Sequence, residues 1–295
     1  MLPSIKISIV PRCNQLSLAE AAAGAAAIQQ QVIDHFAPVW KISAVVTALE
    51  RPEVGYVPVF VIDNITVPGL TGYHTVDDGS PYAVVQYGAT WTLAASHECL
   101  EMILDPSADR RVSAPLPSQT PKTVDFILEV CDPCQSKDCA YLIGRFLVSD
   151  FYTPNYFDSN ATPGIYYSYN RKLIMPKEVQ PGGTLAWIDT DSHAYQLTNQ
   201  GGSVNIRDCG IFKPGPMAAR EFMYRFDQSH LELSHATADP TIAGDLHIHC
   251  MACEVANKSH CAKYEKDLCA KGLTTRRKKP GSKRHKRTTK EKEKG

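Results

Sequence analysis

The sequence has no long hydrophobic segment and no sign of export. None of its uninterrupted apolar runs approaches the roughly 20 residues that a membrane-spanning helix needs. The first residues, MLPSIKISIVPRC, hold no apolar core behind a basic stretch and no small-residue cleavage site, so no signal peptide is expected. We therefore expect a cytoplasmic protein without a membrane partner. Its ten cysteines should then be reduced, buried or metal-bound rather than paired in a disulfide framework.

Net charge is also lacking, but this balance hides an asymmetry. The chain has 31 basic and 31 acidic residues, of which residues 271–295 hold twelve Lys and Arg against two Glu. The rest of the chain is therefore acidic. The terminal segment has too few apolar residues to form a core, so we expect residues 271–295 to be a disordered basic tail.

Such a tail, rich in Lys and Arg without interleaved aromatic residues, can bind phosphate backbones or acidic surfaces through counterion release. It could equally neutralise the acidic remainder of its own chain, act as a localisation signal or have no partner. Nucleic acid or an acidic surface is therefore an expected partner class, with little sequence preference.

Hydrophobic periodicity and turn residues predict the order strand, helix, three strands, helix. The expected elements are residues 5–10, 18–36, 41–49, 57–62, 82–87 and 90–104, followed by strands at 124–130 and 141–148. Ser17 is the expected N-cap of the first helix, with Glu20 three residues later as in a capping box. The pattern indicates an α/β (α+β) fold with a β-rich region after the second helix.

The second helix carries the most informative motif, Ser96-His97-Glu98-Cys99-Leu100-Glu101. His97 and Glu101 are four residues apart, so they project from one helix face and can bind the same ion. Glu98 is placed to act on a metal-bound water as a general base. This is the arrangement of His-Glu-x-x-His zinc peptidases, with Glu101 in place of the second His. Because Glu also binds zinc, the motif still predicts a Zn²⁺ site.

A zinc site of this kind needs a third ligand. Asp105 is the nearest carboxylate in sequence, whereas Glu129 or Asp132 could arrive from the next strand and the turn that follows it. Tyr152 or Tyr156 could stabilise an oxyanion, as a tyrosine does in several zincins. The sequence leaves these alternatives open.

The predicted order of elements is similar to that of zincins such as the metzincins. In that group a strand–helix–several-strands unit precedes the metal helix, and an edge strand just before the helix binds an extended substrate. Residues 82–87 take the place of that edge strand here. A metzincin motif continues with Gly and a third His, whereas this chain has Asp105-Pro106-Ser107, so it departs from that pattern. The resemblance implies a zincin-like mixed sheet with a metal-site helix.

The chain also resembles a group of uncharacterised, mostly bacterial proteins over about residues 20 to 190. The shared blocks are residues 36–40, 96–106 with the pattern Ser-His-Glu-x-Leu-Glu-Met-x-x-Asp-Pro, 129–133 and 148–157. The resemblance implies at most a metallopeptidase-like domain. We expect that domain over residues 1–235, followed by a Cys/His-rich segment at 236–270 and the tail at 271–295.

Two cysteine clusters suggest other metal sites. Cys250 and Cys253 have the spacing at which two thiolates bind one tetrahedral ion. Cys261 or His260, together with Cys269, could complete a structural zinc site. Reduced cysteines on a short helix, or one disulfide, are the alternatives. A second cluster, formed by Cys131, Cys134 and Cys139, could be a metal clip, a disulfide or a loop held by turn chemistry.

The expected function is metal-dependent hydrolysis, most simply of a peptide bond in a peptide or protein substrate. Zn²⁺ would be held by His97, Glu101 and a third carboxylate, with Glu98 as the base and substrate extended along residues 82–87. The alternative is a non-catalytic, zincin-derived scaffold, or a virion or assembly component. Either would bind nucleic acid or an acidic partner through the basic tail.

Overall fold

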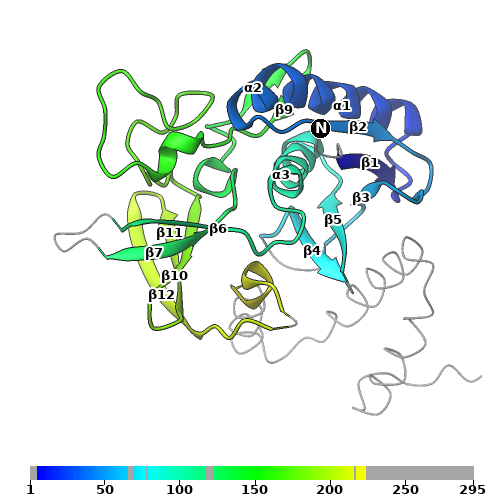
Figure 1. The fold of residues 1–295 in the computed structure, drawn as a ribbon. Coiled ribbons are helices and arrows are strands. Elements are labelled where there is room, and N and C mark those ends of the chain that lie inside the picture. Colours follow the sequence, from blue (N-terminus) through cyan, green and yellow to red (C-terminus); the bar gives the residue numbers. More distant parts are fainter. Residues whose placement is uncertain (1–4, 66–68, 78, 117–121, 216, 224–295) are drawn as a thin grey trace, which may run out of the picture. The chain divides into compact units, whose positions relative to one another are not determined.

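The computed structural model describes residues 5–65, 69–77, 79–116, 122–215 and 217–223 (Figure 1). The expected domain boundary at residue 235, the Cys/His-rich segment and the basic tail lie outside these residues. The described part combines helices with two five-stranded sheets, which confirms the α+β class. Within it, no helix is long and apolar enough to cross a membrane.

The first sheet precedes the second long helix in the chain. Its strands are β1 (Ile5–Pro11), β2 (Ala44–Ala48), β3 (Val57–Ile62), β4 (Gly72–Asp77) and β5 (Ser80–Gln86), in the order β2-β1-β3-β5-β4. β1, β2, β3 and β5 are parallel, and β4 pairs antiparallel to β5. β3 is buried at five of its six positions, as its nearly continuous apolar sequence predicts for a central parallel strand.

The prediction that residues 82–87 form an edge strand is wrong. β5 lies inside the sheet, because it pairs with β3 on one side and with β4 on the other. The edge position belongs to β4, which forms a hairpin with β5 across the turn at Asp77. Sequence alternation identifies a strand but does not say which of two hairpin strands is outermost.

A long helical segment covers one face of this sheet. It consists of α1 (Leu18–Gln30), a π-helical turn (Gln31–Phe36) and α2 (Ala37–Trp40). The Ser17 side chain accepts a hydrogen bond from the Glu20 backbone N–H at 3.2 Å, which confirms the predicted N-cap. The helix runs four residues beyond the expected end and stops at Lys41, whose φ is 58°.

Helix α3 (Trp91–Leu104), which carries the His97–Glu101 motif, packs beside α1 (Figure 1). Both helices share one hydrophobic core with the same face of the sheet, which includes Ile7, Val59 and Val85. Twelve of the fourteen residues of α3 are buried. Its polar side chains are therefore enclosed rather than exposed to solvent. The helix ends before Pro106, as predicted.

The second sheet is entirely antiparallel. Its strands are β6 (Arg111–Pro115), β7 (Thr123–Ile127), β10 (Thr184–Ile188), β11 (His193–Gln200) and β12 (Ser203–Ile211), in the order β12-β11-β10-β7-β6. Between β7 and β10 lie a 3₁₀ turn (Asp132–Cys134), a small hairpin of β8 (Tyr141–Ile143) and β9 (Phe146–Val148), and a second 3₁₀ turn (Pro154–Phe157). The strand expected at 141–148 is thus a hairpin, because Gly144 adopts a φ of 59° and reverses the chain.

Candidate metal centre

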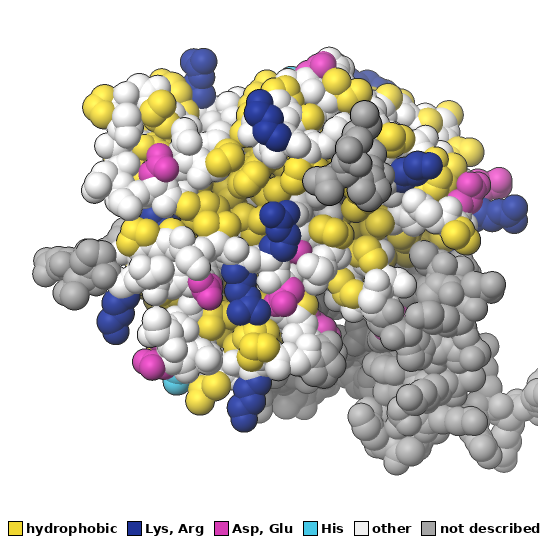
Figure 2. All heavy atoms as spheres, in the orientation of Figure 1, with side chains coloured by type: hydrophobic (Ala, Val, Ile, Leu, Met, Phe, Trp, Pro, Cys, Tyr) yellow, Lys and Arg dark blue, Asp and Glu magenta, His cyan; other side chains and the backbone are white. Residues whose placement is uncertain are grey.

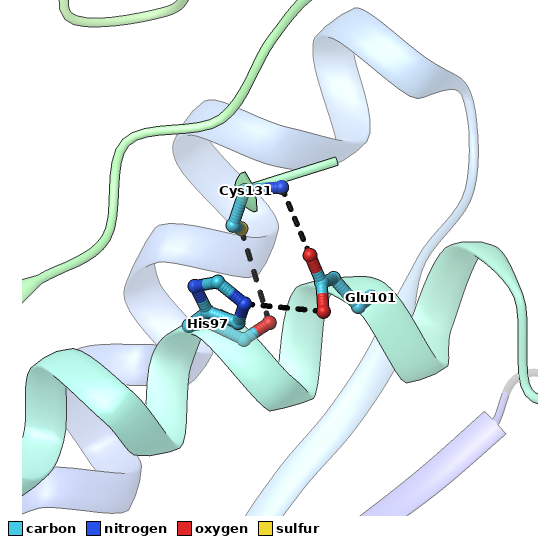
Figure 3. Close-up of side chains that lie close together, drawn as sticks. All are labelled: His97, Glu101 and Cys131. Carbon is cyan, nitrogen blue, oxygen red and sulfur yellow. Dashed lines mark hydrogen bonds and ion pairs between the residues drawn. The ribbon is translucent and has the colours of Figure 1, made fainter. Parts of the chain in front are cut away.

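His97 and Glu101 lie one turn apart on α3 and face each other (Figure 3). The distance from His97 Nε2 to Glu101 Oε2 is 3.2 Å, and both residues are buried. The motif therefore forms the pair of side chains that its spacing predicts. The apolar residues between them face the core, which fixes the direction of both side chains.

Cys131, from the segment after β7, crosses above this pair (Figure 3). Its backbone N–H donates to Glu101 Oε1 at 3.1 Å, and its Sγ lies 3.8 Å from the His97 carbonyl oxygen. One oxygen of Glu101 is thus held by the backbone, while Oε2 is buried without a hydrogen-bond donor. A buried carboxylate oxygen without a donor is costly, so this position fits a bound cation.

Asp132, like Glu101, brings a carboxylate oxygen close to His97 Nε2. Its Oδ1 lies 3.4 Å from His97 Nε2, and its Oδ2 accepts a hydrogen bond from Thr184 Oγ1 at 3.1 Å. Gly183 permits this arrangement, because a Cβ there would lie 2.6 Å from the Pro133 carbonyl oxygen. The start of β10 can therefore approach the turn closely enough to orient Asp132. A hydrogen bond from outside that orients a carboxylate is typical of metal ligands.

Glu129 brings a further buried carboxylate, and Arg220 accompanies it. Glu129 Oε1 lies 3.0 Å from Arg220 Nε, which is an ion-pair distance. The orientation of the two groups does not allow a hydrogen bond. Candidate ligand atoms of Glu101, Glu129 and Asp132 all lie within 4.8 Å of one another. Of the carboxylates that the sequence offered as third ligand, Glu129 and Asp132 therefore reach the site.

Asp105 is held elsewhere. One of its oxygens accepts from Ser107 Oγ at 2.8 Å, and the other accepts from the Arg110 backbone N–H at 2.7 Å. These bonds close the end of α3 and join it to the following loop. Asp105 is thus occupied as a helix-end residue, and it is absent from the groups of converging ligand atoms among the described residues.

His74 is a member of the site that sequence reasoning missed. This buried residue of β4 places Nδ1 2.9 Å from Glu98 Oε2 and 3.4 Å from Glu101 Oε2. The turn before residue 82 was recognisable in the sequence. Interpreting that turn as a hairpin would have produced β4 and placed His74 beside the metal helix. Arg220, by contrast, has no local signal in the sequence.

The charges of the cluster are strongly coupled. Burial alone would lower the pKa of His97, but the neighbouring Glu101 and Asp132 raise it well above its ordinary value. Burial would raise the pKa of Glu101, but the facing His97 outweighs this and lowers it. Burial raises the pKa of Glu129 well above its usual range, against the opposing effect of Arg220. The cluster therefore favours positive charge next to Glu101, which a protonated His97 supplies and which a divalent ion could replace.

A cleft of about 490 Å³ opens onto the cluster. His97, Glu98, Asp132 and Arg220 line it, together with other residues that include Gly72 at the start of β4 and Thr184 at the start of β10. The cleft thus connects the edge strand of the first sheet with the catalytic candidates on α3. Glu98 borders the cleft although its side chain is only 3% exposed.

The two tyrosine candidates lie deeper. Tyr152 and Tyr156 stack with ring centroids 4.4 Å apart, and both are fully buried. The Tyr156 hydroxyl donates to the Glu178 carbonyl oxygen at 3.0 Å. Tyr152 has a buried hydroxyl without a hydrogen-bond partner, and burial raises its pKa well above the ordinary value. Neither ring is among the residues that line the cleft.

The cysteine clusters have separate outcomes. Cys250, Cys253, Cys261 and Cys269 lie outside the described residues. Cys131, Cys134 and Cys139 are buried and form no disulfide. Their three sulfurs are not one of the converging ligand groups, and backbone hydrogen bonds from Cys134 to Cys131 and from Cys139 to Ser136 make the loop a series of turns. Turn chemistry therefore accounts for this loop.

Comparisons with known proteins identify no relative of this chain. No family model, no curated protein and no solved structure matches the chain. The function must therefore be argued from the arrangement of the residues themselves.

Proposed function

We propose that this protein is a zincin-like, zinc-dependent hydrolase that cleaves peptide bonds. One observation carries the proposal. At the floor of an open cleft, His97 Nε2 lies 3.2 Å from Glu101 Oε2 and 3.4 Å from Asp132 Oδ1. Zinc bonds of about 2.0–2.1 Å in a tetrahedron place neighbouring ligands roughly 3.3–3.4 Å apart. These two distances match that spacing, and Glu101 and Asp132 also bring ligand atoms within 4.8 Å of each other, so the proposal assigns these three residues as the zinc ligands.

In this proposal, bound zinc would supply an acidic water and polarise the scissile carbonyl group. The protein's own contribution is to hold the reactants. Glu98, next to His97 on α3 and facing the same cleft, takes up a proton from the attacking water and returns it to the leaving nitrogen. Buried surroundings keep other water from the base, since its side chain is only 3% exposed.

The order of elements supports the zincin-like assignment. A strand, a helix and four strands precede α3, and an edge strand comes just before β5 and the helix. The outer backbone edge of β4 is the place for an extended peptide, because β5 is paired on both sides. The substrate position moves from residues 82–87 to residues 72–77.

The first test is metal content of the purified full chain by mass spectrometry. Wild type is expected to carry zinc, and His97→Ala combined with Glu101→Ala to lose about one ion per chain. Cys250→Ser with Cys253→Ser is the matched control, since it removes thiols of the other expected site and leaves α3 intact. Zinc content unchanged by the His97/Glu101 pair of substitutions would contradict the site.

The second test is turnover on a pool of quenched fluorescent peptides. Glu98→Gln should retain zinc and lose activity by about 10²-fold or more, because the amide cannot accept the proton. Equal activity of this variant and wild type would rule out Glu98 as the base. A zinc-loaded wild type that cleaves no peptide would rule out the peptidase and leave a metal-bearing scaffold.

Nucleic-acid binding is a second candidate, and it depends on the twelve basic residues at 271–295. On the face shown in Figure 2, Lys and Arg side chains are interspersed with acidic and apolar ones rather than gathered in a stripe. In this candidate, salt-dependent binding to DNA or RNA comes from the tail. Removal of residues 271–295 should abolish such binding, and an unchanged affinity would contradict this candidate.

A further inference from the structure

We propose that β4 positions the general base, with His74 holding one oxygen of Glu98 and Gly72 making room for the other. The inference deepens the proposed function and rests on the role given there to Glu98. It assigns to His74 a positioning role rather than that of a metal ligand.

The hydrogen bond is the first observation. His74 Nδ1 lies 2.9 Å from Glu98 Oε2, the ordinary length of an N–H···O hydrogen bond. A general base must be in its carboxylate form, which only accepts hydrogen bonds, so the proposal places the proton on His74 Nδ1 as the donor to Glu98. Two ligands of one tetrahedral zinc would lie roughly 3.3–3.4 Å apart, so the 2.9 Å distance favours a direct bond between His74 and Glu98. The distance from His74 Nδ1 to Glu101 Oε2, 3.4 Å, does match the ligand spacing, so the metal content of a His74 variant decides between the two roles.

Gly72 supplies the second observation. Gly72 and His74 are two residues apart on one strand, so they face the same side of the sheet. A Cβ at Gly72 would lie 2.9 Å from Glu98 Oε1. The carboxylate is therefore held between the two residues, with Oε2 bonded to the imidazole and Oε1 against the bare backbone. Gly72 and Glu98 both line the cleft, which leaves Oε1 as the proton-accepting atom.

Arg220 and Glu129 contact His74 through atoms other than the Nδ1 that faces Glu98. Its carbonyl oxygen accepts a hydrogen bond from Arg220 Nη1 at 2.8 Å, and its Nε2 lies 3.7 Å from Glu129 Oε2. Arg220 Nε in turn lies 3.0 Å from Glu129 Oε1. The residue is 2% exposed and its Nε2 makes no hydrogen bond, so the Arg220 bond fixes the backbone of His74 while packing, rather than water, limits the orientation of the ring. A fixed imidazole can orient a base within the tolerance that proton transfer requires.

Kinetics and metal content together test the assignment. His74→Ala should keep zinc at the wild-type level and lower kcat by about 10²-fold, with KM little changed. His74→Asn should recover most of this loss in kcat, because its amide nitrogen can replace Nδ1 as the donor. Gly72→Ala should lower kcat about 10-fold by displacing Glu98 Oε1, again without loss of zinc. Loss of zinc in His74→Ala would overturn the inference and make His74 a ligand. Unchanged kcat would overturn it as well.

A second readout needs no turnover. In zinc-loaded full chain labelled with ¹⁵N-histidine, the His74 Nδ1–H should exchange slowly, and this signal should vanish in Glu98→Ala. The exposed pair of His193 Nδ1 and Asp208 Oδ2, 3.0 Å apart, is the internal control and should not change. Persistence of the His74 signal in Glu98→Ala overturns the inference. Wild type that shows the signal but cleaves no peptide overturns the hydrolase instead, so the two failures are distinguishable.

Discussion

Asp132 Oδ1 lies 3.4 Å from His97 Nε2, which joins the turn after β7 to helix α3. The contact connects the two sheets of the described part, because Asp132 is anchored by Thr184 at the start of β10. A ligand set drawn from α3 and this turn would therefore link the metal to the packing of the second sheet.

Asp132 and Asp105 should differ in their effect on zinc binding. Asp132→Asn is expected to weaken zinc affinity about 10–100-fold or more, because a ligand oxygen loses its charge. Asp105→Asn should retain affinity and lose about 1 kcal/mol of unfolding free energy, since its bonds to Ser107 and Arg110 only close the helix end. Competition titration with a chromophoric chelator measures both. The reverse order of effects would make Asp105 the ligand.

Arg220 should be essential for stability. Arg220→Met removes the cation that opposes the effect of burial on the pKa of Glu129 and leaves this buried carboxyl without its partner, so we expect a loss of about 1–3 kcal/mol in urea unfolding of the chelator-treated protein. Adding Glu129→Gln should recover part of the loss. The control is Arg145→Met, whose partner Glu20 is exposed and which should change stability by less than about 1 kcal/mol. Similar losses in the two single variants would contradict the buried pair.

Asp150 should make stability depend on pH. Burial raises its pKa to about 6, although hydrogen bonds from Asn170 and Phe151 act in the opposite direction. A carboxyl group with a raised folded-state pKa stays protonated in the fold while it ionises in the unfolded chain. Its contribution is therefore fully present below about pH 4 and is lost as pH rises towards about 6, by about 3 kcal/mol.

Asp150→Asn isolates this effect. Relative to wild type, the variant should gain stability as pH rises from about 4 to 6 and then remain about 1–2 kcal/mol more stable, since its amide still lacks a partner at the second position. Urea unfolding across this pH range measures the difference. A difference independent of pH would show that Asp150 has an ordinary pKa.

Gly24 should be required for the contact between α1 and α3. A Cβ at this position would lie 2.5 Å from Trp91 Cη2, so Gly24→Ala is expected to destabilise by about 1–3 kcal/mol despite the better helix propensity of Ala. Trp91→Phe removes the ring atoms in question, and the double variant should lose less than the sum of the two. Thermal unfolding of the four proteins provides the comparison. Strict additivity would mean that the helices do not meet there.

Local periodicity determined the parts of this protein that depend on neighbours in sequence. The pairing of His97 with Glu101 follows from helix geometry, and the Ser17 cap and the buried strand β3 follow from equally local patterns. These features need only a few consecutive residues, so the sequence alone predicts them.

Tertiary packing decided the rest. Asp132 rather than Asp105 faces His97 because the second sheet presses the turn after β7 against α3, a contact between distant segments. His74 reaches Glu98 because β4 rather than β5 is the outer strand, and alternation cannot distinguish the two. Arg220 arrives from a segment without any motif. Side-chain periodicity is a local property, whereas the convergence of buried charges depends on how whole elements pack.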